Sequence, residues 1–590
     1  MPKVTINGNL IEVAPGTTIR DAAEQAGITI PTMCYLEHRA PLGACRVCVV
    51  DVEGARTLLA ACATPVAEGM VIHTNNHRVR EARKTVVELL LSEHEGNCQY
   101  CDRSLDCELK DLAYRLGVEN IRYTGAKPDV GIDTSTPALY RDTGKCIKCR
   151  RCVTVCNEVQ KVGALFPQYR GYDTVVGPAF AMDLEGVACV QCGQCAAVCP
   201  VGAISERTHM EGVWQAIEDP EKHVVVQTAP AIRAALGECF DYEPGTLVTG
   251  KMVTALRQLG FDAVFDTNFA ADLTIMEEGT ELLTRLKNVL VDKGDAKLPL
   301  FTSCSPGWIK FAEYYYPEFL SNLSTCKSPQ QMFGAVAKTF YAQQKGIDPS
   351  KLVVVSVMPC TAKKFEAARP EMTDSGFPDV DFVLTTRELG RMIQTAGIDF
   401  RGLEDGRMDN PLGFSTGAAD IFANTGGVME AALRTAYEIV TGRELPVPNL
   451  HITPVAGLDG VKEASVTIEG ALEDWSFLEG VEVKVAVAHG LGNAGTLLDA
   501  IRSGEKAYHF VEIMTCPGGC IGGGGQPRMT DDETRQKRIA AIYAEDEGKA
   551  TRKSHENPFV AELYASFLEK PLGERSHHLL HTSYRPRQRA

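Results

Sequence analysis

Three features are missing from this 590-residue sequence. No uninterrupted apolar stretch approaches the roughly 18 residues of a membrane-spanning helix, so we expect no membrane span. No N-terminal segment combines a basic start with an apolar run, so we expect no signal peptide and a cytoplasmic protein. A basic excess is also missing, because 60 basic and 76 acidic residues give a formal charge of −16. That balance argues against a protein that binds nucleic acid mainly through phosphates.

Cysteine, by contrast, is abundant, with 21 residues. Secreted disulfide scaffolds are usually short, whereas this chain is long enough for roughly three or four domains. Its 44% hydrophobic and 23% charged residues are typical of a globular protein. Fifteen cysteines precede residue 200 and six follow it, so we expect the two parts of the chain to do different chemistry. With a disulfide scaffold disfavoured, we expect the cysteines to bind metal.

Two copies of C-x2-C-x2-C-x3-C lie between residues 146 and 199. This run is typical of two-cluster ferredoxins, in which the fourth cysteine of each run binds the other cluster. Structural zinc prefers paired C-x2–4-C units with a long gap, so tandem triplets fit it poorly. We predict a two-cluster domain over residues 138–208, in which one [4Fe–4S] cluster is held by Cys146, Cys149, Cys152 and Cys199 and the other by Cys189, Cys192, Cys195 and Cys156.

A first cysteine set lies in a predicted domain over residues 1–76, where two β-type runs flank an Asn-Gly turn and a helical stretch follows near 18–26. Its C-x2-C core is that of a plant-type [2Fe–2S] site, but the first gap is ten residues rather than four. The spacing therefore leaves zinc as an alternative to iron–sulfur. The ligands would be Cys34, Cys45, Cys48 and Cys62.

A second set follows a predicted helix over residues 77–91, in a predicted domain over 77–123. Taken alone, one histidine and three cysteines indicate structural zinc, and the histidine could equally be an ordinary surface residue. Between two iron–sulfur modules, the set favours a histidine-ligated [4Fe–4S] cluster held by His94, Cys98, Cys101 and Cys107. A polar stretch over 124–137 is expected to be a linker.

After residue 209, apolar β-type runs alternate with helical stretches such as 429–440. That alternation predicts an α/β domain with mainly parallel sheets over residues 209–590, within a multidomain α+β chain. The expected strands are 224–228, 262–265, 298–302, 352–357, 380–384, 483–487 and 510–514.

Three of these strands end in cysteine, at Cys304, Cys360 and the pair Cys516 and Cys520. Functional groups in α/β sheets gather at the carboxyl ends of strands, so these distant residues are expected to share one centre. Glycines at 518–519 and 522–525 would let the backbone approach a bulky cofactor closely. Inert buried cysteines are common in cores, but they explain three such strand ends poorly.

At these residues the chain resembles the [FeFe]-hydrogenases. Thr302–Trp308 (TSCSPGW), Met358–Glu366 (MPCTAKKFE) and Glu512–Cys520 (EIMTCPGGC) are similar to that family's three signature motifs, and Ser554–Asn557 is similar to its C-terminal segment. The four N-terminal sites also follow the family's order. The resemblance implies a β-grasp [2Fe–2S] ferredoxin domain, a small His/Cys domain, a bacterial-type ferredoxin domain and a large two-lobed catalytic domain.

The resemblance further implies an H-cluster, in which a [4Fe–4S] cubane is bridged to a di-iron unit with CO, cyanide and an amine dithiolate. Cys360, Cys516 and Cys520 would bind the cubane, with Cys520 as the bridge. Lys363 would hydrogen-bond a cyanide, although it could also be an ordinary exposed lysine. The di-iron pocket would be lined by Ala229, Pro230, Gln330, Met358 and Met514, although methionines at strand ends are more often plain core.

The chain departs from the family at one adjacent pair. The family usually has two neighbouring cysteines, the first a proton carrier and the second a cubane ligand, whereas this chain has Cys304 and Ser305. Either Ser305 ligates through oxygen, or Cys304 becomes the ligand and the proton route changes. We favour Cys304 as the proton carrier, because a thiol with a pKa near neutrality suits proton transfer better than a serine hydroxyl.

The family's proton path matches Glu278, Glu281, Ser324 and Arg285 in this chain. The two glutamates are three residues apart and would share one face of a helix, which without the motifs would indicate a solvated acidic surface. Cys239 and Cys326 are assigned to packing.

The expected reaction is the reversible conversion of H2 into two protons and two electrons. The expected cofactors are the H-cluster, three [4Fe–4S] clusters and one [2Fe–2S] cluster. No GxGxxG follows a strand here, so the electron partners would be ferredoxin or flavin- and NAD(P)-binding iron–sulfur subunits, and maturation proteins would build the H-cluster. The alternatives are a non-catalytic electron-transfer subunit, which residues 1–208 also resemble, and a hydrogen sensor.

Overall fold

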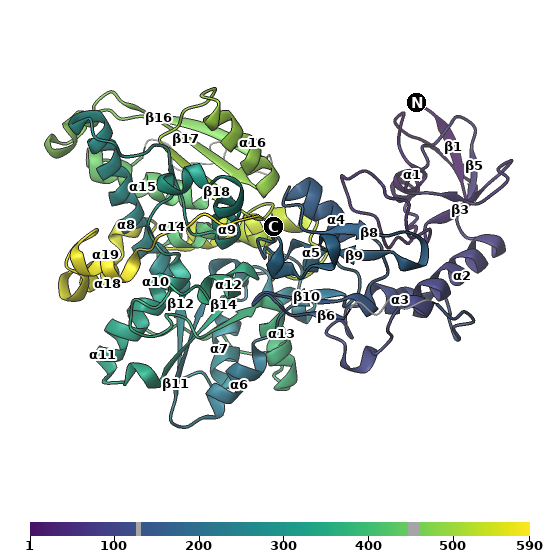
Figure 1. Ribbon diagram of the computed structural model, residues 1–590, viewed down its shortest axis with the longest axis horizontal. Helices are drawn as coiled ribbons and strands as arrows, with labels where there is room; N and C mark the ends of the chain where they lie inside the picture. The colour runs from purple at the N-terminus through teal and green to yellow at the C-terminus, as the bar shows by residue number, and fades with distance from the viewer. Residues whose placement is uncertain (126–130, 446–459, 590) are drawn as a thin grey trace.

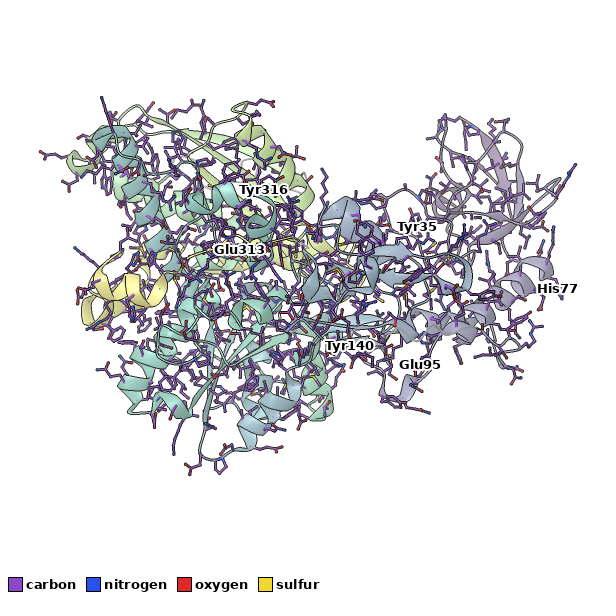
Figure 2. All side chains as sticks on the ribbon, in the orientation of Figure 1. Tyr35, His77, Glu95, Tyr140, Glu313 and Tyr316 are labelled. Atoms are coloured by element: carbon purple, nitrogen blue, oxygen red, sulfur yellow. The ribbon has the colours of Figure 1, made fainter. Side chains whose placement is uncertain are left out.

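The computed structural model describes residues 1–125, 131–445 and 460–589 (Figure 1). A smaller N-terminal arm extends from a larger body that contains most of the later chain (Figure 1). We call residues 1–208 the arm and residues 209–589 the body. Figure 2 places His77 at the far end of the arm, Tyr140 nearer the body, and Glu313 and Tyr316 within the body. None of the described helices has the length and apolar character that a membrane crossing needs.

The arm begins with a five-stranded sheet in the order β2-β1-β5-β3-β4, on which one helix packs. The expected Asn-Gly hairpin is present, because β1 and β2 pair antiparallel around Asn7 and Gly8. Val4, Ile6, Ile19 and Ile72 are fully buried between sheet and helix. The elements are β1 Lys3–Ile6, β2 Asn9–Glu12, α1 Ile19–Gln25, β3 Val49–Val52, β4 Leu59–Ala60 and β5 Val71–His73.

The rest of the arm consists of short elements around cysteine loops. Two helices precede the cysteine repeat, and a three-stranded sheet in the order β10-β7-β6 and a two-stranded hairpin frame it. Part of the expected linker, residues 126–130, lies outside the described residues. The elements are α2 His77–Glu93, α3 Glu108–Arg115, β6 Ile132–Asp133, β7 Leu139–Asp142, α4 Arg151–Thr154, β8 Phe166–Gln168, β9 Val175–Gly177, α5 Gln194–Ala197 and β10 Ile204–Glu206.

The body contains two four-stranded sheets, in the orders β12-β11-β14-β15 and β13-β18-β17-β16. Every strand pair is parallel except β16 with β17. All residues of β14 and β18 are buried, as expected for parallel strands covered on both faces. The strands are β11 His223–Thr228, β12 Ala263–Asp266, β13 Leu300–Phe301, β14 Leu352–Met358, β15 Phe382–Thr385, β16 Val461–Thr467, β17 Glu482–His489 and β18 Phe510–Met514.

Helix α8 (Thr267–Lys287) is buried along most of its length, with 16 of its 21 residues inaccessible. It packs against α10 and α15 and begins directly after β12. The other helices of the body are α6 Met210–Glu218, α7 Thr249–Leu259, α9 Pro306–Tyr315, α10 Pro329–Val336, α11 Ala342–Lys345, α12 Ala362–Ala367, α13 Thr386–Thr395, α14 Gly417–Asp420, α15 Gly427–Thr441, α16 Leu491–Arg502, α17 Asp532–Gly548, α18 Pro558–Leu563 and α19 Glu574–Leu580.

Candidate metal centres and active site

The three cysteine-bearing strand ends of the body meet at one cavity of about 740 Å³. They belong to both sheets, since β14 leads to Cys360, β18 to Cys516 and Cys520, and β13 to Cys304. The expected pocket residues line the same space. The lining includes Ala229, Pro230, Gln330, Met358, Lys363 and Met514, together with Ser305.

The residues around this cavity fit a cysteine-held metal cluster. Burial raises the pKa of the Cys520 thiol to about 12 and also raises the pKa values of Cys360 and Cys516. Cys516 is buried and Cys360 and Cys520 are half-buried. Three such thiols that face one cavity are costly to ionise alone, but a bound metal takes them as thiolates. Gly519 has φ +94°, and a side chain at Gly523 would overlap the Pro359 carbonyl, so glycine lets the backbone close around the site.

Lys363 is fixed at the wall of the cavity. Its Nζ donates to Glu366 Oε2 at 2.9 Å and to the Cys304 carbonyl at 3.1 Å. Glu366 also accepts hydrogen bonds from Ser328 and Gln330. The paired ammonium therefore has a defined position beside the thiols, unlike an exposed lysine.

Cys304 and Ser305 point into different surroundings. Burial, and then the nearby acidic side chain of Glu278, raise the pKa of the Cys304 thiol well above its usual value. The thiol is therefore protonated, and its pKa is not near neutrality as the sequence analysis expected. Ser305 Oγ lies 2.7 Å from the Thr515 hydroxyl and accepts a hydrogen bond from the Thr515 backbone N–H at 3.2 Å. Cys304 thus faces the acidic helix, whereas Ser305 is held beside the residue that precedes Cys516.

The four residues of the expected proton path lie together along α8. Ser324 Oγ donates to Glu281 Oε2 at 2.8 Å, and Arg285 Nη2 donates to Glu281 Oε1 at 2.7 Å. Burial, with the neighbouring Glu281 carboxylate, raises the pKa of Glu278 to about 8. Both glutamates are buried, so this is not the solvated acidic helix face that the residue spacing alone would indicate.

The cysteine repeat surrounds two adjacent sites. A cavity of about 410 Å³ is lined by the first predicted set of four, Cys146, Cys149, Cys152 and Cys199. In the second set, burial raises the pKa values of Cys192 and Cys195, and the nearby thiols of Cys189 and Cys156 add to both shifts. Both runs use left-handed residues at equivalent places, which turn the loops inward. These are Lys148 and Arg150 in the first run, and Gln191 and Gly193 in the second.

The [2Fe–2S] candidates are four buried thiols at the edge of the first sheet. Cys48 Sγ lies 3.3 Å from Cys62 Sγ, and the Cys45 backbone N–H donates to Cys34 Sγ at 3.5 Å. Hydrogen bonding from Cys45 lowers the pKa of Cys34 to about 6. The arrangement brings together all four expected ligands of this site.

The histidine-bearing set is more open. His94 Nδ1 lies 2.8 Å from the Lys145 carbonyl, which only accepts, so Nδ1 carries the proton and Nε2 the lone pair that a metal needs. Cys107 lies near Cys101, whose sulfur would overlap a side chain at Gly202. Cys98 is exposed. Arg103 donates to the Cys199 carbonyl, which ties this loop to the cysteine repeat.

The second cysteine run contacts residues that are chain neighbours of those lining the cavity of the body. Thr361 Oγ1 donates to the Gln191 carbonyl at 2.7 Å, and Gln194 Nε2 donates to the Gly522 carbonyl at 2.9 Å. Side chains at Gly193 and Gly524 would overlap Thr361 and the Cys192 carbonyl. The glycines therefore let the second cysteine run approach the loops that follow Cys360 and Cys520 closely.

Several buried residues of the site escaped the sequence reasoning. Glu512 accepts hydrogen bonds from the Gly426 and Met429 backbone N–H groups, each at 2.7 Å, and caps α15. His581 and Cys326 lie against Glu281. Cys326 is also part of the apolar core, in agreement with its assignment to packing. The only signal for His581 was its place in a histidine-rich segment, which gives no spatial information.

Comparison with known proteins gives the same family for nearly the whole chain. Residues 222–524 match the family model "Iron only hydrogenase large subunit, C-terminal domain", and 532–587 match "Iron hydrogenase small subunit". In the arm, three models match: a 2Fe-2S iron-sulfur cluster binding domain (2–77), an NADH-ubiquinone oxidoreductase-G iron-sulfur binding region (83–122) and a 4Fe-4S dicluster domain (145–203).

Similar proteins span the full length as well. The chain is 54% identical to the NADP-reducing hydrogenase subunit HndD of Solidesulfovibrio fructosivorans, over 100% of both chains. It is 41% identical to iron hydrogenase 1 of Clostridium pasteurianum, over 99% of this chain and 100% of that one. A solved [FeFe]-hydrogenase of Chlamydomonas reinhardtii superposes with a TM-score of 0.58 at 44% identity, covering 64% of this chain and 99% of that one. The chain belongs to the iron-only, or [FeFe], hydrogenase family, and it is an iron hydrogenase with an H-cluster domain and [2Fe–2S] and [4Fe–4S] domains.

Proposed function

We propose that the chain interconverts H2 with protons and electrons in its body and exchanges the electrons with NAD(P)-linked subunits through its arm. The observation that carries this proposal is the position of the thiol-lined cavity. A buried carboxyl and hydroxyl path approaches it along α8, and the second cysteine run contacts the glycine loop that follows Cys520. Protons and electrons therefore have separate routes to one site.

Within that site, we assign Cys360, Cys516 and Cys520 as the thiolates that hold the H-cluster cubane, with Ser305 at the fourth position. The bonds from Thr515 support this assignment, because they keep Ser305 on the side of Cys516. When bound, the H-cluster supplies the iron chemistry that splits and forms H2. Lys363 places a positive charge at the wall, where an anionic ligand of the cluster would accept its hydrogen bond. Ala229, Pro230, Gln330, Met358 and Met514 exclude water.

Four side chains would move the proton between the cavity and the surface. The Cys304 thiol holds a proton at the cavity, and Glu278, with its pKa raised to about 8, is a protonated carboxyl at neutral pH. Ser324 can relay a proton through its hydroxyl, because it donates to Glu281 while it lies beside Glu278. Arg285 donates to Glu281 Oε1, and we place the surface end of the proton path at this pair.

Electrons would pass through the arm in the order in which its metal sites adjoin. The Cys189, Cys192, Cys195 and Cys156 site adjoins the body, and the Cys146, Cys149, Cys152 and Cys199 site follows. The Cys34 set shares an apolar core with this second site. The loop of the His94 set contacts it through Arg103, which donates to the Cys199 carbonyl. We assign one [2Fe–2S] cluster to the Cys34 set and three [4Fe–4S] clusters to the other three sets.

The partner is inferred from similarity. The chain is 54% identical to a protein named as the subunit of an NADP-reducing hydrogenase, so flavin- and NAD(P)-binding iron–sulfur subunits are the partners we favour over free ferredoxin. Pyridine nucleotides are used in the cytoplasm, which is where we place the protein, and maturation proteins would assemble the H-cluster there.

Infrared spectroscopy of the matured protein tests the proposal. Stretches of CO and cyanide are expected between the usual protein bands, and they should change when H2 is added. A fully matured protein that lacks these bands would contradict hydrogenase activity. Matured protein with the bands but without reduction of NAD(P) through added partner subunits would contradict the partner assignment alone.

A further inference from the structure

A carboxylate, a thiol and an imidazole converge beside the proton path. Glu281 comes from α8, Cys326 from the segment before α10, and His581 directly follows α19. One ligand atom from each lies within 4.8 Å of the others, and all three residues are buried. Cys326 and His581 also form an antiparallel β-bridge, which fixes their backbones side by side. From this geometry we propose that Glu281, Cys326 and His581 form a Zn²⁺ site whose occupation interrupts the proton path.

The donor set is the one that zinc uses. Zinc binds cysteine sulfur at about 2.3 Å, histidine nitrogen at about 2.0–2.1 Å and carboxylate oxygen at about 2.0–2.2 Å, usually in a tetrahedron. Donors at those lengths lie roughly 3.3–3.7 Å apart, so the three side chains need to approach one another by only about 1 Å. The fourth position is left for water. Binding releases the Cys326 thiol proton to solvent, so a site with one thiolate, one carboxylate and one dication has no net charge.

A carboxylate already orients the imidazole for this role. His581 Nε2 lies 3.2 Å from Glu277, which also accepts hydrogen bonds from Tyr564, Ser576 and the Leu572 backbone N–H. A carboxylate with so many donors is an anion, so Nε2 donates its proton to it. The lone pair is then on Nδ1, where the Thr325 hydroxyl lies at 2.8 Å. Histidines that bind metals commonly donate their second N–H to a carboxylate in this way.

Occupation of the site would remove Glu281 from the proton path. In the structure the two oxygens of this carboxylate accept from Ser324 and Arg285, and both bonds belong to the proposed route. Zn²⁺ bound to Glu281 would occupy carboxylate lone pairs that otherwise accept protons. Its positive charge would also repel a proton that moves along the path. This consequence rests on the proposed function, whereas the metal site itself does not.

A second group of ligands serves as a contrast. Glu438, His555 and Glu556 also converge, but they are partly or fully exposed. Lys553 Nζ already lies 2.7 Å from Glu438 and 3.4 Å from Glu556, so a cation occupies that group. This group offers no thiol, which lets spectroscopy distinguish the two places.

Zinc-edge X-ray absorption of the full chain, with iron–sulfur clusters in its other cysteine sets, tests the site directly. After removal of adventitious metal, one equivalent of Zn²⁺ should show one sulfur neighbour at about 2.3 Å and nitrogen or oxygen neighbours near 2.0 Å. Cys326→Ser should lose the sulfur neighbour, whereas the matched controls Cys239→Ala and His555→Gln should retain it. A sulfur shell that persists in Cys326→Ser, or no sulfur shell in the unmodified chain, would overturn the site.

The rate of H2 evolution with a dye reductant tests the consequence, each variant being compared with its own zinc-free rate. Saturating Zn²⁺ should slow the unmodified enzyme at least about tenfold, and a chelator should restore it. Cys326→Ser should raise the half-inhibiting Zn²⁺ concentration by at least about tenfold. Zinc bound through Cys326 without any slowing would overturn the interruption of the path. A chain with the sulfur shell but without CO and cyanide bands would refute the proposed function and leave the zinc site standing.

Discussion

The arm and the body hold cysteine in opposite ways. In the arm, most ligands of a site are a few residues apart, and short loops with left-handed residues such as Lys148 and Gln191 turn them inward. In the body, Cys360 and Cys516 are more than 150 residues apart and meet only because β14 and β18 end at one cavity. The arm's sites are therefore local structures, whereas the body's site depends on the packing of two whole sheets.

The difference predicts that a single substitution in the body can lower turnover without loss of the H-cluster. Cys304→Ala should leave the CO and cyanide bands in place and lower turnover by about 10³-fold or more, because the cavity loses its proton carrier. Infrared spectroscopy and H2 evolution on one preparation measure both effects. Disappearance of the bands would instead make Cys304 the cubane ligand and reverse the assignment of Ser305.

A smaller effect is expected one step further along α8. Glu278→Gln keeps the shape but cannot exchange a proton, so turnover should fall about 10²-fold, with ordered water bridging part of the gap. Because burial raises the pKa of Glu278 to about 8, the carboxyl is protonated below that pH and loses its proton above it. H2 evolution by the unmodified enzyme should therefore fall as the pH rises through about 8. This pH-dependent fall should be absent in Glu278→Gln.

An unchanged pH profile in Glu278→Gln would show that another group causes the decrease in H2 evolution at high pH. Glu281→Gln is a useful companion, because it removes the outer carboxylate and leaves Glu278 in place.

The junction between arm and body offers a prediction about stability. The buried Arg387 guanidinium of the body donates to Glu206 of the arm at 2.6 and 3.0 Å and to the Gly524 carbonyl at 2.9 Å. Arg387→Met leaves a buried carboxylate poorly paired and should lower the local opening free energy by about 3–5 kcal/mol. Hydrogen exchange in residues 204–206 and 522–526 measures this change.

Arg391→Met is the matched control for that substitution. Arg391 also joins the body to the arm, through Asp102 at 3.2 Å, but this pair is partly exposed. Its loss should cost at most about 1 kcal/mol. Equal effects of the two substitutions would show that burial does not determine the strength of the junction.

The smallest effect is expected at a single neutral bond. Thr361→Val removes the hydroxyl that donates to the Gln191 carbonyl and keeps the side-chain shape. The loss should be about 1 kcal/mol in the same hydrogen-exchange measurement. Thr361→Ser retains the hydroxyl and should restore most of that stability; if it fails to do so, the methyl packing rather than the hydrogen bond stabilises the contact.

The same contrast explains what the sequence could predict. Strands of the body were expected where β11, β12, β13, β14, β15, β17 and β18 lie, because each is a short apolar run. Strand β16 was missed, since it is an antiparallel edge strand with partly exposed residues and no apolar run. The burial of α8 could not be predicted from the sequence either, because glutamates such as Glu277, Glu278 and Glu281 are typical of an exposed helix. Only their tertiary partners, such as His581 and Ser324, show why they are inside.

The glycine contacts between the second cysteine run and the body have a consequence for variation at this junction. A side chain at Gly524 would meet the Cys192 carbonyl and the Gly193 backbone, and one at Gly193 would meet the Thr361 side chain. Any substitution at these two positions adds atoms where the arm and the body already touch. We therefore expect such substitutions to increase the separation between the two metal sites and not to decrease it.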